Sequence, residues 1–125
     1  WIVALRENKP RFYRYNGDSW VETLTLNCDW NRLENAGSFI ATETRIFVAY
    51  GRSGDLLLRV STDDGQTWNG PFMIDELGAR NIVYVDANVP SDFSSNGNHA
   101  SFFYGFDNDG DGKCKVKFAK VEDKR

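Results

Sequence analysis

The octapeptide Ser61-Thr62-Asp63-Asp64-Gly65-Gln66-Thr67-Trp68 decides the fold of this chain, and it directly follows the largely apolar run Leu56–Val60. An apolar run that ends in small polar residues predicts a strand leading into a tight turn. Gly65 can take the positive φ that such a turn requires. The Asp63 carboxylate and the serine hydroxyl two residues before it can accept hydrogen bonds from turn N–H groups. We expect Trp68 to bury its indole beside the next strand.

The spacing S-x-D-x-G-x-T-W resembles the Asp-box, also called the bacterial neuraminidase repeat, of sialidase-like β-propellers. The resemblance implies a structural role. In that family the box joins the third and fourth strands of a four-stranded blade, on the face opposite the sialidase active site. Ser61, Asp63, Gly65, Thr67 and Trp68 are therefore expected to hold the turn and to take no part in chemistry.

Short β-rich runs separated by turn clusters extend over the whole chain, and helical periodicity is almost absent. The sequence therefore predicts an all-β protein of about ten antiparallel strands. The expected strands are Trp1–Arg6, Arg11–Tyr15, Trp20–Leu26, Ser38–Thr42, Arg45–Tyr50, Leu56–Ser61, Phe72–Asp75, Asn81–Asp86, Ala100–Phe106 and Lys115–Val121.

The strands divide into roughly two and a half propeller-type blades within a single domain, residues 1–125. Residues 38–75 make a complete blade that carries the box, and residues 1–26 and 81–121 make partial blades on either side. A decayed copy of the box lies 48 residues earlier, with Gly17 aligned to Gly65 and Trp20 aligned to Trp68.

A closed propeller needs about four to eight blades, and an open arc would leave unpaired strand edges. We therefore expect either a fragment of a larger chain or a homo-oligomer whose copies cover the terminal strands. A β-sandwich or small barrel carrying an Asp-box is the alternative architecture.

Composition excludes some classes of function. The 15 basic and 18 acidic residues give a formal net charge of −3, so the basic surface typical of nucleic-acid binding is missing. No apolar run reaches the length of a membrane span. Two cysteines, Cys28 and Cys114, show no C-x-x-C spacing, and the sequence leaves their redox state open.

The loops opposite the box carry the candidate ligand-binding residues. Three arginines from different loops resemble the cluster with which sialidases grip a sugar carboxylate, because guanidinium groups pair with carboxylates bidentately. The Arg-Ile-Pro signature and the Tyr-Glu nucleophile pair of sialidases are missing, and the same arginines also fit ordinary solvated loops. The candidates are Arg32, Arg52 and Arg80, with the carboxylate Glu76 and the aromatic Trp30, which could stack on a sugar or pack under its own loop.

Asp107-Asn-Asp109-Gly-Asp111-Gly112 matches the opening of a calcium-binding loop, D-x-D-x-D-G. Its twelfth position is Phe118, which cannot supply the closing carboxylate. The sequence therefore leaves two interpretations, a calcium site at Asp107, Asp109 and Asp111 or an acidic hairpin turn.

Asp-boxes also occur in small microbial ribonucleases, which pair a catalytic histidine with a glutamate and carry an N-terminal helix. The chain has one histidine, His99, without an evident partner, and no predicted helix. We expect His99 to be exposed or to cap a turn, which leaves the ribonuclease as a remote alternative.

The sequence therefore predicts a non-catalytic or partial sialidase-like propeller module directed at glycans, in an extracellular or periplasmic setting. It would bind carbohydrate or form part of a glycoside hydrolase. A β-propeller scaffold that binds a protein surface is the alternative.

Overall fold

The computed structural model describes residues 1–7, 9–27, 37–79, 81–88, 97–107 and 113–124. These residues form ten antiparallel strands and no helix, so the all-β class predicted from the sequence is confirmed. Within the same ranges there is accordingly no helix able to span a membrane. The strands are β1 (Ile2–Arg6), β2 (Lys9–Tyr15), β3 (Trp20–Thr25), β4 (Gly37–Ala41), β5 (Ile46–Arg52), β6 (Asp55–Ser61), β7 (Asn69–Asp75), β8 (Asn81–Asn88), β9 (His99–Asp107) and β10 (Lys115–Glu122).

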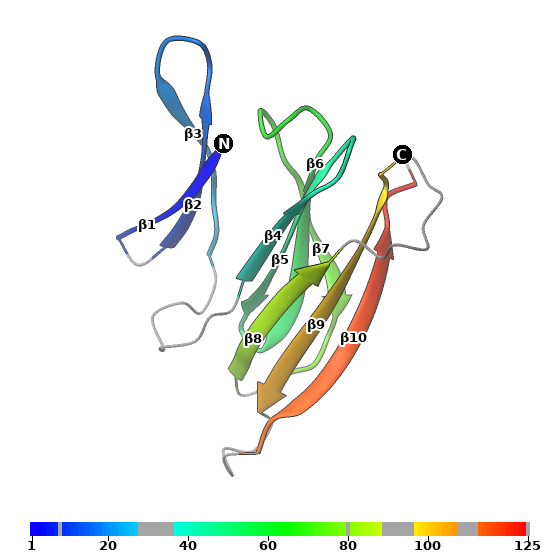
Figure 1. Ribbon diagram of the computed structural model, residues 1–125. Coiled ribbons are helices and arrows are strands. Elements are labelled where there is room, and N and C mark those ends of the chain that lie inside the picture. The colour runs from blue at the N-terminus through cyan, green and yellow to red at the C-terminus, as the bar shows by residue number, and fades with distance from the viewer. Residues whose placement is uncertain (8, 28–36, 80, 89–96, 108–112, 125) are drawn as a thin grey trace.

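The strands form three sheets that follow one another along the chain. The N-terminal sheet has the order β1-β2-β3, the central sheet β4-β5-β6-β7 and the C-terminal sheet β10-β9-β8, and paired strands are antiparallel throughout. Figure 1 shows the central sheet between the other two. None of the described strands closes a sheet into a barrel.

Strand β5 explains why a sheet lies on each side of the central sheet. Every residue from 46 to 50 is buried. Successive side chains of a strand point to opposite faces. Ile46, Val48 and Tyr50 pack with Phe12 of the N-terminal sheet, and the two residues between them pack against the C-terminal sheet. A strand that is apolar on both faces can be buried only between two layers.

The core consequently has two layers. The layer between the N-terminal and central sheets consists of Phe12, Leu24, Leu26, Ile46, Val48 and Tyr50. The layer between the central and C-terminal sheets consists of Phe47, Ala49, Leu56, Leu58, Val60, Ala79, Ile82, Val85, Ala100, Phe102, Tyr104 and Phe106.

Strand β7 begins earlier than the sequence suggested. The sequence predicted a strand from Phe72, but Asn69-Gly70-Pro71 already belongs to β7, where Asn69 pairs with Val60. A register shift between Leu58 and Val60 accommodates the glycine, whose φ is 109°. Proline is tolerated there because β7 is the edge strand of its sheet and the missing N–H leaves no ladder bond unmade.

The turn between β2 and β3 differs from the Asp-box that its sequence partly copies. The Asn16 side-chain oxygen accepts hydrogen bonds from the N–H groups of Asp18 and Ser19, both at 2.9 Å. Trp20 lies against Tyr15, with ring centroids 5.5 Å apart, and remains exposed. This turn is therefore stabilised locally, and its tryptophan does not enter the core.

Glycine is required at position 65 for two reasons. Its φ is 80°, and a Cβ atom there would lie 2.3 Å from a ring carbon of the buried Phe12. We expect Gly65→Ala to lower the free energy of unfolding by about 3 kcal/mol, since a left-handed backbone costs about 1–2 kcal/mol and overpacking adds about 1–3 kcal/mol. Urea denaturation would measure the loss.

The matched control is Gly17→Ala. Gly17 also has a positive φ, 96°, but a Cβ atom there would meet nothing within 4 Å. We expect this variant to lose only the backbone cost of about 1–2 kcal/mol. Equal losses in the two variants would contradict the close contact between the box and Phe12.

Candidate functional site

The loop from Ser61 to Trp68 joins β6 to β7, the third and fourth strands of the central sheet, and is held by hydrogen bonds within itself. The Ser61 hydroxyl donates to the Asp63 carboxylate at 2.9 Å and accepts the Gly65 N–H at 2.8 Å. The Asp63 carboxylate also accepts the Thr67 N–H at 2.9 Å and the Thr67 hydroxyl. These bonds lower the pKa of Asp63, chiefly the one from the Thr67 hydroxyl.

Thr23 of the N-terminal sheet connects that sheet to the loop. Its hydroxyl donates to the Gly65 carbonyl at 2.5 Å and accepts the Trp68 indole N–H at 3.2 Å. The Trp68 ring packs edge-to-face with the Phe12 ring, with the two ring centroids 5.0 Å apart, and also lies near Phe39. The sequence suggested that this indole would lie beside the next strand, but it is partly buried against the preceding sheet. Nothing in the local sequence around Thr23 indicates this role.

A polar hollow lies beside the loop, at the end of the central sheet that we call the box end. Its volume is about 480 Å³. The residues that line it come from the chain start, the β4–β5 turn and the box loop, and are Trp1, Ala41, Thr42, Glu43, Thr44, Arg45, Ile46, Thr62, Asp63, Asp64 and Gln66. Trp1 is 48% exposed, and its ring also contacts Phe12, with the two ring centroids 5.2 Å apart. The hollow therefore combines an accessible aromatic ring with hydroxyl, amide and carboxylate groups.

The β4–β5 turn forms a firmly held wall of this hollow. The Thr42 hydroxyl accepts the Arg45 N–H at 3.1 Å and donates to the Gly97 carbonyl. Arg45 donates from Nε to Asp123 Oδ2 at 2.8 Å, and the two side chains are only 9% and 5% exposed. Its Nη1 donates to Thr44 at 2.9 Å. The Arg45 cation is thus largely compensated inside the protein.

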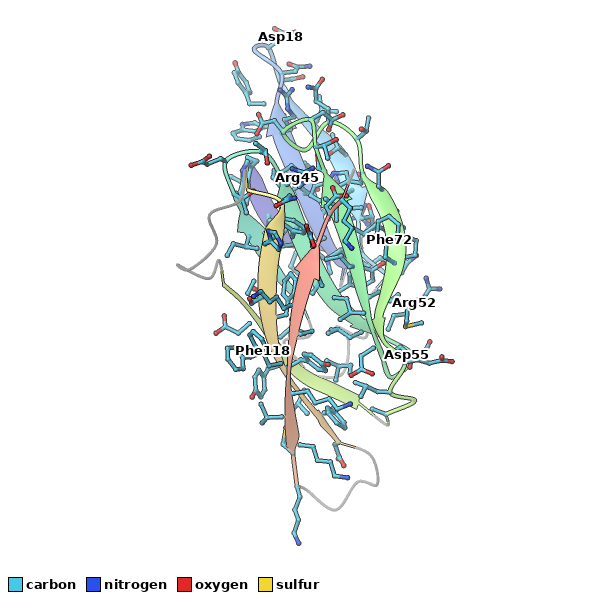
Figure 2. The ribbon with its side chains drawn as sticks, turned by 90° about the vertical axis from the view of Figure 1, so that its right-hand side faces the viewer. Asp18, Arg45, Arg52, Asp55, Phe72 and Phe118 are labelled. Atoms are coloured by element: carbon cyan, nitrogen blue, oxygen red, sulfur yellow. The ribbon has the colours of Figure 1, made fainter. Side chains whose placement is uncertain are left out.

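Two of the five predicted ligand-binding residues fall within the described ranges, at the opposite end of the central sheet. Arg52 closes β5 and is exposed, and Glu76 follows β7 and is exposed. Figure 2 shows Arg52 well below Arg45 and close to Asp55. Trp30, Arg32 and Arg80 lie outside the described residues. A glycan site formed by these five residues therefore stays a prediction.

The predicted calcium ligands are described only in part. Asp107 ends β9, whereas Asp109 and Asp111 lie outside the described residues. Across the described ranges no group of three or more His, Cys, Asp or Glu side chains is placed to hold a metal ion. Cys114 is exposed, and Cys28 lies outside the described residues.

The sequence offered no evident partner for His99, but the structure places this histidine beside a glutamate. It pairs across the sheet with Glu122, with Nε2 and Oε1 3.5 Å apart, and it is partly buried. The contact therefore joins the ends of β9 and β10.

Comparisons with known proteins identify no relative: no family model matches the chain, and no significant match exists among curated proteins or solved structures. The functional argument therefore rests on the chain's own geometry.

The Thr23 bridge predicts a specific loss of stability. Thr23→Val keeps the shape of the side chain but leaves the Gly65 carbonyl and the Trp68 indole N–H without their hydroxyl partner. We expect the free energy of unfolding to fall by about 1–3 kcal/mol, the cost of unpaired polar groups away from water. Thr62→Val, at an exposed position of the same loop, is the control and should change stability by less than about 0.5 kcal/mol. An unchanged free energy of unfolding in Thr23→Val would show that the two hydrogen bonds of the Thr23 hydroxyl contribute nothing to stability.

The lowered pKa of Asp63 predicts a pH dependence. Because the folded state favours its ionised form, Asp63 stabilises the fold above its unfolded pKa of about 4, and this contribution is lost as the pH falls through the lower folded pKa. Asp63→Asn should therefore be less stable than the native chain at pH 7, and the difference should shrink below about pH 4. Melting curves from pH 2 to pH 7 would measure it. Asp64→Asn, at the exposed neighbouring position, is the control, and an equal pH profile for both variants would contradict this role of Asp63.

Proposed function

We propose that this chain is a non-catalytic, carbohydrate-binding module of the sialidase-like propeller type. Two features of the fold support the proposal. The box loop joins the third and fourth strands of a four-stranded antiparallel sheet. The three sheets follow one another in chain order, and each flanking sheet packs one face on the central sheet. Extracellular or periplasmic glycans are the ligands that such a module would meet.

The polar hollow at the box end is the observation that carries the proposal. Sugars offer apolar C–H faces and many hydroxyl groups, and a tryptophan ring with nearby polar groups complements both. Trp1 offers the ring at the rim of the hollow, and the exposed Thr62 and Gln66 offer hydrogen-bonding groups.

The charges around the hollow favour a neutral glycan. Three acidic residues, Glu43, Asp63 and Asp64, line it together with one basic residue, Arg45. Arg45, the one basic side chain among the described lining residues, is already paired with Asp123 and is poorly placed to bind a sugar carboxylate. We therefore expect neutral oligosaccharides to bind better than sialic acid.

Binding rather than hydrolysis fits the state of Asp63. A glycosidase needs one carboxyl group that is protonated to act as the acid and a second carboxylate at a defined separation. The hydrogen bonds from Ser61 and Thr67 occupy both oxygens of Asp63 and keep its pKa low. It therefore serves the loop and is unsuited to donate a proton.

The outer faces of the two flanking sheets support the expectation that this chain is part of a homo-oligomer or of a longer chain. Tyr15 and Trp20 are exposed on the N-terminal sheet, and Phe103 and Phe118 are exposed on the C-terminal sheet. The opposite faces of the same sheets are packed on the central sheet. Further sheets, from a second copy or from a longer chain, would cover these apolar side chains in the same way.

The test compares two equally exposed tryptophans. Saturation-transfer NMR and calorimetry would measure binding of neutral galactose-, glucose- and mannose-based oligosaccharides, with N-acetylneuraminic acid as the anionic comparison. We expect Trp1→Ala to weaken neutral-glycan binding about three- to tenfold, the usual effect of losing one aromatic contact. Trp20→Ala is the control, because Trp20 is 51% exposed but lies away from the hollow.

Two results would overturn the proposal. One is the absence of binding by all neutral sugars at millimolar concentration. The other is an equal loss in Trp1→Ala and Trp20→Ala, which would remove the box-end hollow as the site.

A further inference from the structure

A second hollow, which we call the hairpin hollow, lies between the box loop and the β2–β3 hairpin. Its volume is about 220 Å³. Four residues of the hairpin line it together with one residue of the box loop, and the five are Arg14, Asn16, Val21, Thr23 and Gln66. The hairpin extends beyond the box loop (Figure 1), and Asp18 at its tip lies above Arg45 in Figure 2. The hairpin therefore adds a wall that the central sheet does not supply.

Polar contacts from two residues hold the hairpin against the box loop. Arg14 donates from Nε to the Asp64 carbonyl at 3.0 Å, and its Nη2 lies 3.7 Å from the Asp64 carboxylate. The Thr23 hydroxyl donates to the Gly65 carbonyl at 2.5 Å. The fold therefore shapes the hairpin hollow before a ligand enters, which lowers the cost of binding. Asp64 offsets the charge of Arg14, and a neutral ligand leaves this ion pair intact.

The groups that line the hairpin hollow match the surface of a sugar. Val21 is 40% exposed and offers an apolar patch to a C–H face. The Asn16 side-chain oxygen accepts two backbone N–H groups, whereas its amide nitrogen has no partner among the described residues and can donate. The Gln66 amide donates to the Asp63 carbonyl at 3.1 Å, which leaves its side-chain oxygen to accept. An apolar patch with a donor and an acceptor complements a ring that carries hydroxyl groups.

Gln66 connects the hairpin hollow to the polar hollow at the box end, because it lines both. The polar hollow measures about 480 Å³, and the hairpin hollow is less than half that size. Each combines an apolar side chain, Trp1 or Val21, with neutral hydrogen-bonding groups. Two adjoining hollows of the same character suit a ligand that repeats one chemical unit, as an oligosaccharide does.

We propose that the two hollows form one extended site for a neutral oligosaccharide of at least two sugar units. One unit stacks on Trp1 in the polar hollow. The next unit lies on Val21 in the hairpin hollow and accepts a hydrogen bond from Asn16, and Gln66 contacts both units. This inference rests on the proposed function and adds to it the length of the ligand and a second set of contacts.

A series of sugars tests the length of the ligand. Calorimetry would measure binding of neutral glucose, galactose and mannose oligomers, each from one to five units, to the whole chain. For the series that binds, we expect the affinity to rise at least tenfold from the monosaccharide to the longer oligomers. A linked second unit adds contacts without a second loss of translational freedom. The affinity should level off once both hollows are filled.

Matched variants of the hairpin locate the second unit. Asn16→Asp keeps an oxygen for the N–H groups of Asp18 and Ser19 and removes the amide donor. It should weaken oligosaccharide binding about three- to tenfold, the effect of one lost hydrogen bond, and leave monosaccharide binding within about twofold. Val21→Ala, which shrinks the apolar patch, should show the same selective loss. Thermal melts would verify that both variants are folded.

The control for the added charge is Ser19→Asp. Ser19 is exposed on the same turn and lines neither hollow, so this variant adds the same negative charge without removing a contact. We expect it to bind every sugar of the series as the native chain does.

Two results would overturn this proposal and leave the proposed function intact. One is equal affinity for the monosaccharide and the longer oligomers, with Trp1→Ala still weakening both. The other is an equal loss in Asn16→Asp and Ser19→Asp, which would assign the effect to charge alone. The absence of binding by every neutral sugar at millimolar concentration would instead overturn both proposals.

Discussion

The burial of β5 on both faces is the constraint on which the rest of this structure depends. Ile46, Val48 and Tyr50 need an apolar layer on one side, and Phe47 and Ala49 need one on the other. Burying one large apolar side chain stabilises a protein by about 1.5–3 kcal/mol. Loss of either flanking sheet would expose alternate residues of one strand, so the three sheets are expected to be stable only together.

The box loop contributes to this arrangement by connecting two sheets as well as closing a turn. Its carbonyl at Gly65 and its indole N–H at Trp68 are both turned toward the N-terminal sheet, away from bulk water. Only a group that donates and accepts at once can serve both, and the Thr23 hydroxyl does so. Phe12 then packs under Gly65 and against Trp68. Polar and apolar contacts therefore join the same two elements.

The sequence predicts the features that local patterns determine. Ten strands and the glycine-containing turn at Gly65 follow from short apolar runs and turn residues. The direction of Trp68 and the role of Thr23 depend on contacts between residues 42 and 45 positions apart, which no local pattern encodes. The box-end hollow has no sequence signal either, because ordinary residues from three separate segments line it. The ligand-binding residues predicted from the sequence lie in part at the other end, where Arg52 and Glu76 are found, and that site stays a prediction.

The ion pair of Arg45 and Asp123 connects the polar hollow with an apolar groove between β10 and the central sheet. Arg45 lines the polar hollow and Asp123 lines the apolar groove, 2.8 Å apart and nearly inaccessible to water. Removal of one partner of such a pair leaves an uncompensated buried charge, at a cost of about 3–5 kcal/mol. The pair therefore favours one arrangement of the β4–β5 turn against the end of β10.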